Sequence, residues 1–478
     1  MGNDAESMNQ SNNEKTTYDK IVSQMKIGVC EMQGWRPTME DAAIVLPNFQ
    51  PKTSLFGILD GHGGSIISEF VSVNFKNVLI RTKSYINGDY EQALVQTFLI
   101  MDELLKDKEV NDFIYNTHNN NSNESKDKND KDNFSRCQTV LKPEKNKIVK
   151  LRFETGVFEF DLNSINLHEG GEGTTTSVYE NKKRFITRKD ELPELNMTND
   201  NSGDNMKFED IFFAKGGKKH PGLNSLPQLE EVFEVNTINI EFEDNGTNFA
   251  YKKKQINQKN INRDNFIANE MGTTANIMLI KNGIIYIANV GDSLSVMYKN
   301  RKAYNLNKEH QVIIESEKER VLKSGAIIKG FRINGMLNLT RALGDLKFKS
   351  NQNLKRHEQS VIAVPEITKI EYTDDIDFII MGCDGVWDCV KRQMVCDFVD
   401  KEIRENPEKD LSEILKVIFD RCVSPVWGVV LGTDNMSCIV IQFLKGEDTI
   451  DNNNNIVVRK INFGESIEDI GKESILQN

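Results

Sequence analysis

Carboxylates at the ends of apolar stretches are the first residues of this sequence that could do chemistry. Asp60 follows the apolar run Ser54–Leu59 and is itself followed by Gly61 and His62, in the string SLFGILDGHGG. The glycines let the chain turn sharply and allow a ligand to approach Asp60 closely. A charged residue after a strand is also often an ordinary loop residue or a helix N-cap. This stretch alone therefore leaves a chemical role open.

Further carboxylates repeat the pattern elsewhere in the chain. Asp384 ends an apolar run, Asp434 stands shortly before one, and Glu40 with Asp41 precedes a short predicted strand. Carboxylates gathered at neighbouring strand ends repel one another unless cations hold them together. Oxygen ligands without a histidine or cysteine cluster favour Mg²⁺ or Mn²⁺ over zinc. Two such ions, roughly 3.5 to 4 Å apart, are a common arrangement for hydrolysing phosphate esters.

The hydrophobic periodicity predicts the elements that position these groups. Strands are predicted at 26–33, 42–46, 54–59, 274–280, 284–290, 294–298, 378–383 and 437–443, and helices at 65–81, from 89 onward, and at 308–325, 391–403 and 410–422. The turn pairs Asn282-Gly283 and Gly291-Asp292 predict that three of these strands form an antiparallel meander. In that interpretation Asp292 is only a turn residue. The charges around Glu40 could likewise be solvated side chains of a hairpin loop.

Composition divides the chain into an ordered domain and polar segments. Residues 1–24 are predicted to be a disordered lead-in, 107–269 a partly disordered low-complexity insertion, and 446–478 a loose tail, which leaves one domain over 25–445. Two alternating stretches inside the insertion, Lys147–Leu162 and Val232–Asp244, predict strands of a small hairpin subdomain.

Charge and cysteine usage limit the partners and the compartment. The 478 residues include 72 acids and 60 bases, a formal net charge of -12, which disfavours nucleic acid as the main partner. The seven scattered cysteines predict reduced thiols inside the cell, in the cytoplasm, the nucleus or both. No apolar run is long enough for a transmembrane segment. Gly2 is in place for myristoylation, but Glu6 occupies the position that prefers Ser or Thr, and one such chain would give only weak membrane association.

Eight short strings together resemble one enzyme family. MQGWRPTMEDA, DGHGG, GTTA, GDS, RALGD, PEI, CDGVWD and GTDNMS occur in the order and approximate spacing of the PPM-type, or type 2C, metal-dependent Ser/Thr protein phosphatases. The resemblance covers about 25–108 and 271–444. It implies an α+β fold, a four-layer α-β-β-α sandwich whose two antiparallel sheets are flanked by helices, with metals bound at one end.

The resemblance also implies roles for individual residues. Two Mn²⁺ or Mg²⁺ ions would be bridged by Asp60, with the Gly61 carbonyl, Asp384 and Asp434 as the other protein ligands. Glu40 and Asp41 would act through metal-bound water, and Asp292 would belong to a third, weaker metal site.

The implied reaction is direct attack on phosphorus by a hydroxide that bridges the two ions. Arg36 would bind the phosphate oxygens, since its planar fork matches them. His62 would be the general acid for the departing Ser or Thr oxygen, although it could instead be a capping residue or support a metal ligand. Substrates would be phosphorylated proteins, and the oligomeric state is open, with a monomer expected.

Two other functions remain open from the sequence. A catalytically weak pseudophosphatase acting as a binding scaffold is disfavoured because a scaffold has no need of mutually repelling carboxylates. A phosphoesterase for nucleotides or nucleic acid is disfavoured by the acidity of the chain. The sequence departs from the family at Leu294, where many relatives have Arg, and at 309–312, where EHQV replaces Asp-His-Lys-Pro. These departures bear on substrate specificity, because neither removes a predicted metal ligand.

Overall fold

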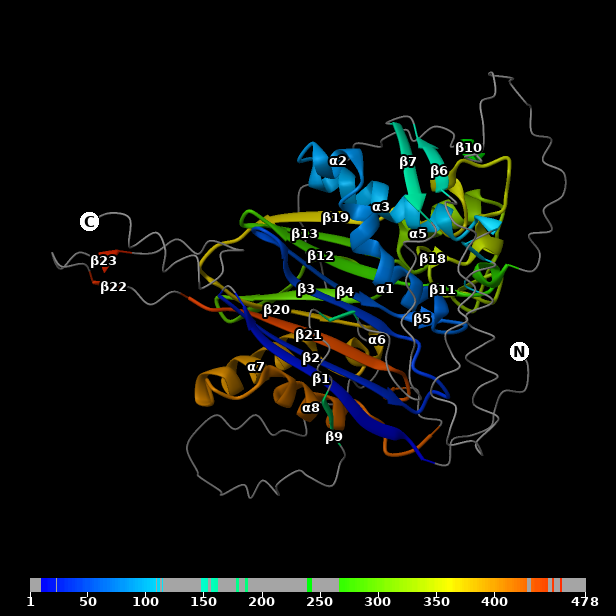
Figure 1. The fold of residues 1–478 in the computed structure, drawn as a ribbon. Helices are drawn as coiled ribbons and strands as arrows, with labels where there is room; N and C mark the ends of the chain where they lie inside the picture. The colour runs from blue at the N-terminus through cyan, green and yellow to red at the C-terminus, as the bar shows by residue number, and fades with distance from the viewer. Residues whose placement is uncertain are drawn as a thin grey trace, which may run out of the picture.

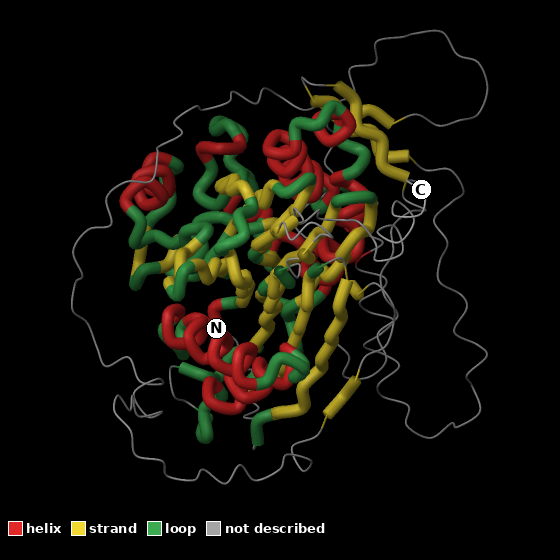
Figure 2. Tube along the Cα trace, turned by 90° about the vertical axis from the view of Figure 1, so that its left-hand side faces the viewer, coloured by secondary structure: helices red, strands yellow, loops and turns green. Residues whose placement is uncertain are grey.

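The structure is a computed structural model that describes residues 10–22, 24–108, 110–111, 114, 266–427 and 431–445, together with short strands in the stretches between and after them. Two sheets, antiparallel in nearly all their pairings, lie face to face, and helices cover both outer faces (Figure 1; Figure 2). The predicted α+β four-layer sandwich is therefore confirmed.

The strands that belong to the two layers are distant in sequence but adjacent in space. The first sheet contains, in spatial order, β15 (Lys302–Asn305), β14 (Leu294–Lys299), β20 (Ile376–Gly382), β21 (Met436–Phe443), β2 (Met25–Gly34), β1 (Asn12–Val22) and β9 (Phe185–Thr187). The second contains β19 (Glu366–Glu371), β13 (Ile284–Val290), β12 (Ala275–Lys281), β4 (Thr53–Leu59), β3 (Ala42–Gln50) and β8 (Val178–Tyr179). A small third sheet at one end contains β18 (Leu343–Gly344), β11 (Gly272–Thr273) and β5 (Gly61–His62).

Helices pack on the outer face of each large sheet. The second sheet is covered by α1 (Ile66–Leu79), α2 (Lys83–Ile86) and α3 (Tyr90–Leu104), and the first by α7 (Arg392–Glu405) and α8 (Leu411–Cys422) (Figure 1). Helix α3 begins near residue 89, as predicted, and Asp89 is its N-cap, since its carboxylate accepts a hydrogen bond from the Gln92 N–H at 3.1 Å. The remaining short helices are α5 (Glu315–Lys323), α6 (Asp384–Trp387), η5 (Ile267–Asn269), η6 (Leu346–Lys349) and η7 (Arg356–Glu358).

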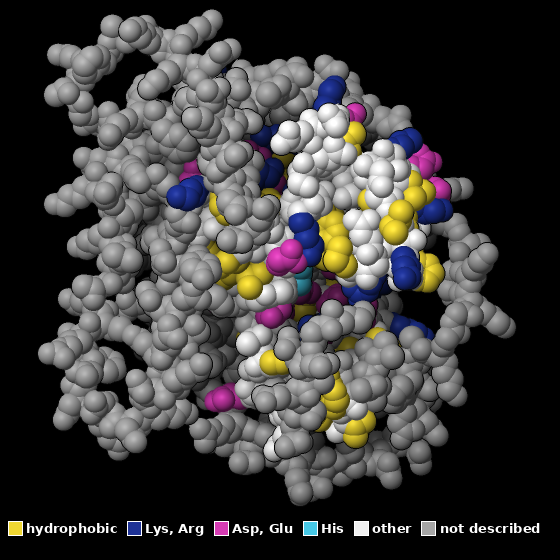
Figure 3. Space-filling view, turned by 90° about the vertical axis from the view of Figure 1, so that its right-hand side faces the viewer, with side chains coloured by type: hydrophobic (Ala, Val, Ile, Leu, Met, Phe, Trp, Pro, Cys, Tyr) yellow, Lys and Arg dark blue, Asp and Glu magenta, His cyan; other side chains and the backbone are white. Residues whose placement is uncertain are grey.

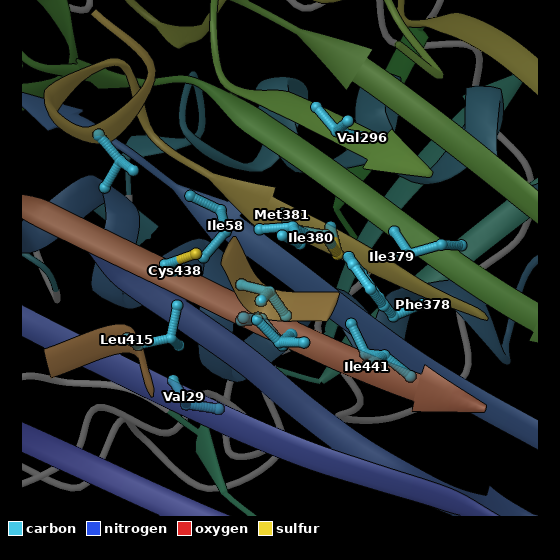
Figure 4. Close-up of a cluster of buried hydrophobic side chains, with 14 of the residues drawn as sticks. Val29, Ile58, Val296, Phe378, Ile379, Ile380, Met381, Leu415, Cys438 and Ile441 are labelled. Carbon is cyan, nitrogen blue, oxygen red and sulfur yellow. The ribbon is translucent and has the colours of Figure 1, made fainter. Parts of the chain in front are cut away.

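The main core lies between the two sheets and beneath α7 and α8. Figure 4 shows part of it: Ile58 from the second sheet lies beside Met381 and Cys438 from the first, and Leu415 from α8 packs on the other face of the first sheet near Val29. Strands β4, β20 and β21 are buried on both faces. This is why they appear in the sequence as nearly continuous apolar runs and not as an alternating pattern.

The predicted disordered lead-in over 1–24 is wrong for much of its length. Strand β1 forms a tight hairpin with β2, in which Val22 pairs with Met25 and Lys15 with Met32. The run Thr-Thr-Tyr within β1 has high β-propensity, and β1 extends the first sheet in spite of its polar composition. Residues 1–9, which include Gly2 with its incomplete match to a myristoylation signal, lie outside the described part.

Polar side chains of β1 bind helix α8, which explains why a polar segment is ordered. The Lys15 ammonium lies 2.6 Å from an oxygen of Asp420. Asp19 accepts a hydrogen bond from the Ser412 N–H at 2.9 Å, in the first turn of α8. Asp410 occupies the N-cap position of α8 but makes no side-chain capping bond. The start of α8 is thus capped from a strand that lies almost 400 residues earlier.

The predicted three-stranded meander is also wrong. β12 and β13 pair as expected, but β14 belongs to the other sheet, where it pairs with β20. Gly291, at a φ of 101°, lets the chain cross between the sheets, and the far edge of β13 pairs with β19 instead. A Gly-Asp pair suits a hairpin turn and a sheet crossing equally well, so the sequence did not distinguish them. The crossing brings Asp292 to the end of the sandwich.

Helix α5 is shorter than the predicted helix over 308–325. Its first predicted turns are irregular, because the His310 N–H donates to the Gly291 carbonyl at 3.0 Å and ties this segment to the sheet crossing. The helix ends close to the predicted boundary at 325, where Gly325 follows the last turn with a φ of 86°.

The insertion is narrower than the predicted 107–269. Val110, Ile114 and Phe266 are buried against α1 and α3, so the ordered domain extends to 114 and resumes at 266. The two predicted strand regions are confirmed as a small sheet: β6 (Ile148–Phe153) pairs with β7 (Gly156–Asp161) and with β10 (Asn239–Phe242). The predicted disorder falls on residues outside the described part, as does most of the tail over 446–478, where β22 (Thr449–Ile450) pairs with β23 (Ile456–Val457).

None of the helices in the described part of the chain combines the length and apolar character needed to cross a membrane.

Candidate metal centre

Strand ends from both large sheets meet at one end of the sandwich. β4 and β3 pair Leu59 with Ala42, which places Asp60 beside Asp41. In the other sheet β20 lies between β14 and β21, so the end of β20 and the starts of its two neighbours are adjacent. Asp384 follows the end of β20, Asp292 precedes the start of β14, and Asp434 precedes the start of β21.

The carboxylates of Asp60, Asp292 and Asp384 form one close group, with one oxygen of each within 4.8 Å of the others. Asp41, Asp60 and the Cys383 thiol form a second group of the same size. The structure therefore brings together residues from both sheets that the sequence separates by more than 300 positions. Asp292 is buried in the first of these groups and is therefore more than a turn residue.

Burial and mutual repulsion raise the pKa values of these carboxyls. The pKa of Asp60 and that of Asp384 lie well above 3.8, first because the groups are buried and then because neighbouring carboxylates repel. Burial likewise raises the pKa of Asp41 to about 7 and that of Asp292 to about 6. Cations bound among these oxygens would reverse the effect, since they favour the ionised form.

The donor set fits hard divalent cations. The Cys383 thiol is already engaged, since its sulfur accepts from the Ser437 N–H at 3.2 Å and donates to the Asn435 carbonyl at 3.5 Å. Burial also raises the pKa of Cys383 well above its usual value. The available ligands are therefore oxygens, which suit Mg²⁺ or Mn²⁺.

Arg36 and Asp434 form an ion pair at the edge of this centre. Nη2 of Arg36 lies 2.6 Å from Oδ2 of Asp434, and both side chains are partly exposed. Burial lowers the pKa of Arg36, but the nearby Asp434, with Asp60 and Glu40, outweighs this and raises it. Asp434 lies beside the tight groups without belonging to them, so its role as a ligand stays a prediction.

Asn435, which the sequence analysis did not single out, holds the segment that carries Arg36 and Glu40. Its Oδ1 accepts the Glu40 N–H at 2.9 Å, and its Nδ2 donates to the carbonyls of Gln33 and Thr38 at 2.8 and 3.0 Å. A Ser437 hydroxyl two residues on donates to Asp41 at 2.7 Å. Both residues belong to the string GTDNMS, which was the available signal.

His62 lies in β5, next to Gly61, and contacts a carboxylate that was not predicted to take part. Its Nε2 lies 2.7 Å from Oδ2 of Asp345, whose side chain is 3% exposed. Burial lowers the pKa of His62, but Asp345, with Asp292 and Glu40 beyond it, outweighs this and raises it. The string RALGD ends at this aspartate, but nothing in its spacing points to His62.

A surface view confirms that this end of the molecule is accessible. In Figure 3 acidic side chains and a histidine lie in a hollow between described surface groups, with basic side chains nearby. A ligand that carries negative charge could approach both the carboxylate centre, once it holds cations, and the basic groups at its rim.

Comparisons with known proteins point to one family. The model of the family "Protein phosphatase 2C" matches residues 25–127 and 224–426. "Probable protein phosphatase 2C 21" of Arabidopsis thaliana is 30% identical over 90% of this chain and 90% of that protein. "Probable protein phosphatase 2C 4" of Paramecium tetraurelia is 26% identical over 92% of this chain and 99% of that protein. A solved structure of a phosphatase from Toxoplasma gondii aligns over 90% of this chain and 95% of that one, at 16% identity and a TM-score of 0.45.

Proposed function

The chain belongs to the protein phosphatase 2C family of metal-dependent protein phosphatases, and from that premise we propose that it hydrolyses phosphoserine and phosphothreonine in proteins. The observation that carries this proposal is the buried group of Asp60, Asp292 and Asp384, which lies close to both Arg36 and His62. Such a centre combines a site for cations with a phosphate-binding cation and a proton donor.

The residues that would hold two Mn²⁺ or Mg²⁺ ions are Asp60, the Gly61 carbonyl, Asp384 and Asp434. Glu40 and Asp41 would bind water molecules of the metals, and Asp292 would serve a third ion. When bound, the cations supply positive charge that lowers the pKa of a shared water, so that hydroxide is available at neutral pH to attack phosphorus directly.

Arg36 would bind and orient the phosphate. Its guanidinium is held at the rim by Asp434 and has five N–H donors, so it can keep this ion pair while it donates to phosphate oxygens. Its partial exposure leaves that face open to substrate.

His62 would protonate the departing oxygen. Asp345 engages Nε2, which leaves Nδ1 as the ring nitrogen that can give a proton to the serine or threonine oxygen. An alkoxide is a poor leaving group, so this proton transfer matters more for phosphoserine and phosphothreonine than for activated esters.

The test is phosphate release from a phosphothreonine peptide by the full-length protein, with Mn²⁺, with Mg²⁺ and with EDTA. We expect release that depends on the cation and falls by at least about 10³-fold in Asp60→Ala, because the bridging carboxylate is lost. Asp374→Ala, an exposed aspartate in the turn before β20, is the matched control and should retain full activity.

Three outcomes would contradict the proposal. Release that persists in EDTA would exclude the metal-dependent mechanism. Absence of release under every condition, with the protein folded, would favour the pseudophosphatase scaffold. Faster hydrolysis of a nucleotide phosphodiester than of the peptide would favour a phosphoesterase for nucleotides or nucleic acid.

A further inference from the structure

We propose that Asp345 is the positioning residue for His62, and that Asp102 fixes the turn that presents Asp345. This inference rests on the proposed function, in which His62 is the general acid. Neither aspartate lies near His62 in sequence: Asp345 is 283 residues away.

The contact between His62 and Asp345 depends on the small third sheet. β11 lies between β5 and β18, and Gly272 pairs with His62 on one side and with Gly344 on the other. This pairing places the residue after β18, Asp345, across the sheet from His62. The 2.7 Å bond is therefore specified by backbone pairing and not by a loose encounter of two side chains.

Gly272 is necessary for this contact. A Cβ at this position would lie 2.7 Å from Nε2 of His62 and even closer to the carboxylate of Asp345. Real Cβ atoms do not approach other atoms so closely, so any side chain at 272 would push His62 and Asp345 apart. Gly272→Ala thus disturbs the contact between His62 and Asp345 although neither residue is itself substituted.

Asp345 holds a backbone conformation that needs support. Its φ of 52° and ψ of 40° lie in the left-handed region, which aspartate and asparagine tolerate better than most residues. Its N–H donates to the Met271 carbonyl at 3.0 Å, and its own carbonyl accepts from the Phe348 N–H at 3.0 Å. The turn is therefore ordered, and its side chain has one direction.

Asp102, on helix α3, holds the same turn by hydrogen bonds. Its Oδ1 accepts the Gly344 N–H at 3.1 Å and lies 2.5 Å from Nζ of Lys349. Lys349 in turn donates to the Ala342 carbonyl at 2.8 Å. Asp102 and Lys349 are each about 95% buried or more, so the network is shielded from water and fixes the turn on both sides of β18.

The consequence for the reaction is orientation of the acid. A carboxylate that accepts from Nε2–H holds the ring in one plane and reserves Nδ1 for the substrate. A neutral amide at 345 would keep the size and tolerate the backbone conformation, but it could turn its NH₂ toward the ring, which requires an unprotonated Nε2 and gives up the Nε2–H bond that orients the doubly protonated ring. His62 would then be present but poorly placed to give its proton.

Two substrates separate positioning from a general loss of structure. A phosphothreonine peptide needs a proton on its leaving oxygen, whereas p-nitrophenyl phosphate releases a stabilised phenolate that does not. The ratio of kcat/KM for the two substrates, measured on one preparation with Mn²⁺, does not depend on how much of the protein is folded. Loss of positioning therefore lowers the ratio even in a partly unfolded variant.

The expected changes form a graded series. Asp345→Asn should lower the peptide-to-aryl ratio by about 10- to 100-fold, Gly272→Ala by about 10-fold, and Asp102→Asn by about 3- to 10-fold, with the loss in kcat and not in KM for the peptide. Glu366→Gln is the matched control, since Glu366 contacts the other buried histidine, His310, at 3.3 Å, and should leave the ratio unchanged.

The outcomes distinguish this inference from the function on which it rests. Equal losses on both substrates in Asp345→Asn and Gly272→Ala, with an unchanged ratio, would overturn the positioning role alone. A wild-type protein that shows no Mn²⁺-dependent release from either substrate would overturn the proposed function and this inference with it.

Discussion

Two histidine–carboxylate pairs lie near the same end of the sandwich, and they differ in the direction of the histidine pKa shift and in the groups that surround the ring. His62 contacts Asp345 beside the acidic centre, whereas His310 contacts Glu366 beneath the sheet crossing. The pKa of His62 is raised, but that of His310 is lowered, because burial dominates there and Arg341 opposes a second positive charge. A carboxylate partner alone therefore does not decide the charge of a histidine.

The second ring nitrogen explains the difference. Nδ1 of His310 accepts the Gly291 N–H at 3.2 Å, which requires that nitrogen to be unprotonated. The neutral ring of His310 is thus held between Gly291 and Glu366, and it stabilises the sheet crossing that carries Asp292. In the His62 pair the carboxylate contacts Nε2, and in the proposed function Nδ1 faces the substrate. One pair is structural and the other is proposed to act in the reaction, and the following predictions test that contrast.

Replacing each histidine by glutamine should give the largest difference. We expect His62→Gln to lower kcat for a phosphothreonine peptide by about 10²- to 10³-fold, because the general acid is lost. His310→Gln should lower it much less, while weakening the fold. The measurement is steady-state kinetics together with Mn²⁺ titration, which should show unchanged metal affinity in His62→Gln. Similar kinetic losses in both variants would remove the contrast.

The surroundings of His310 should lose stability in acid. Glu317 accepts from Arg341 at 2.6 Å and from the Thr340 hydroxyl at 2.7 Å. Burial opposes its ionisation, but these partners and Arg320 outweigh it and lower the pKa of Glu317 from 4.5 to about 2. The stabilisation is thus complete above pH 4.5 and disappears as the pH falls toward 2, since the unfolded chain takes up the proton first.

Glu317→Gln measures this contribution. It should lower the free energy of unfolding by on the order of 3 kcal/mol at neutral pH and by much less near pH 3. Urea unfolding at several pH values is the measurement. A loss that stays constant from pH 7 to pH 3 would show that the charge of Glu317 is not its source.

At the acidic centre, removal of the metal should give a pH dependence of stability opposite to that near Glu317. Without cations the folded protein keeps protons on Asp41 and Asp292, whose pKa values are raised to about 7 and about 6. The unfolded chain releases them near pH 4, so the metal-free protein loses stability as the pH rises through this interval. Mn²⁺ removes that penalty, and its stabilisation should therefore increase from pH 5.5 to pH 8.

Thermal unfolding with and without EDTA measures this effect. Mn²⁺ at a hundredfold excess over its Kd should add about 2.7 kcal/mol at the higher pH. Asp292→Asn and Asp41→Asn should each reduce the pH dependence of the metal-free protein. A Mn²⁺ effect that is equal at both pH values would mean that burial and the neighbouring carboxylates do not raise the pKa values of Asp41 and Asp292.

The sequence indicated that Asp60 and Asp384 gather at neighbouring strand ends, as the structure shows, and the reason is physical. Asp60 and Asp384 follow strands buried on both faces, so apolar runs that end in Asp-Gly mark them. Partners that are held by tertiary pairing gave no such signal. Asp345 reaches His62 through β11, and Asp19 reaches α8 across 393 positions, so neither spacing nor periodicity reveals them. The sheet crossing at Gly291 was missed because its turn chemistry suits a hairpin equally well.

Glu366→Gln should have the smallest effect, and it tests the contrast most directly. Glu366 is one-third exposed and lies 3.3 Å from Nε2 of His310, and an amide oxygen can still accept that hydrogen bond. We therefore expect a loss in unfolding free energy of no more than about 1 kcal/mol by urea titration. Because His310 is held in its neutral form by Gly291 as well, its ring should stay in place and phosphatase kinetics should be unchanged. A kinetic loss as large as that in Asp345→Asn would show that His310 also serves the reaction, and the two pairs would then differ in position but not in role.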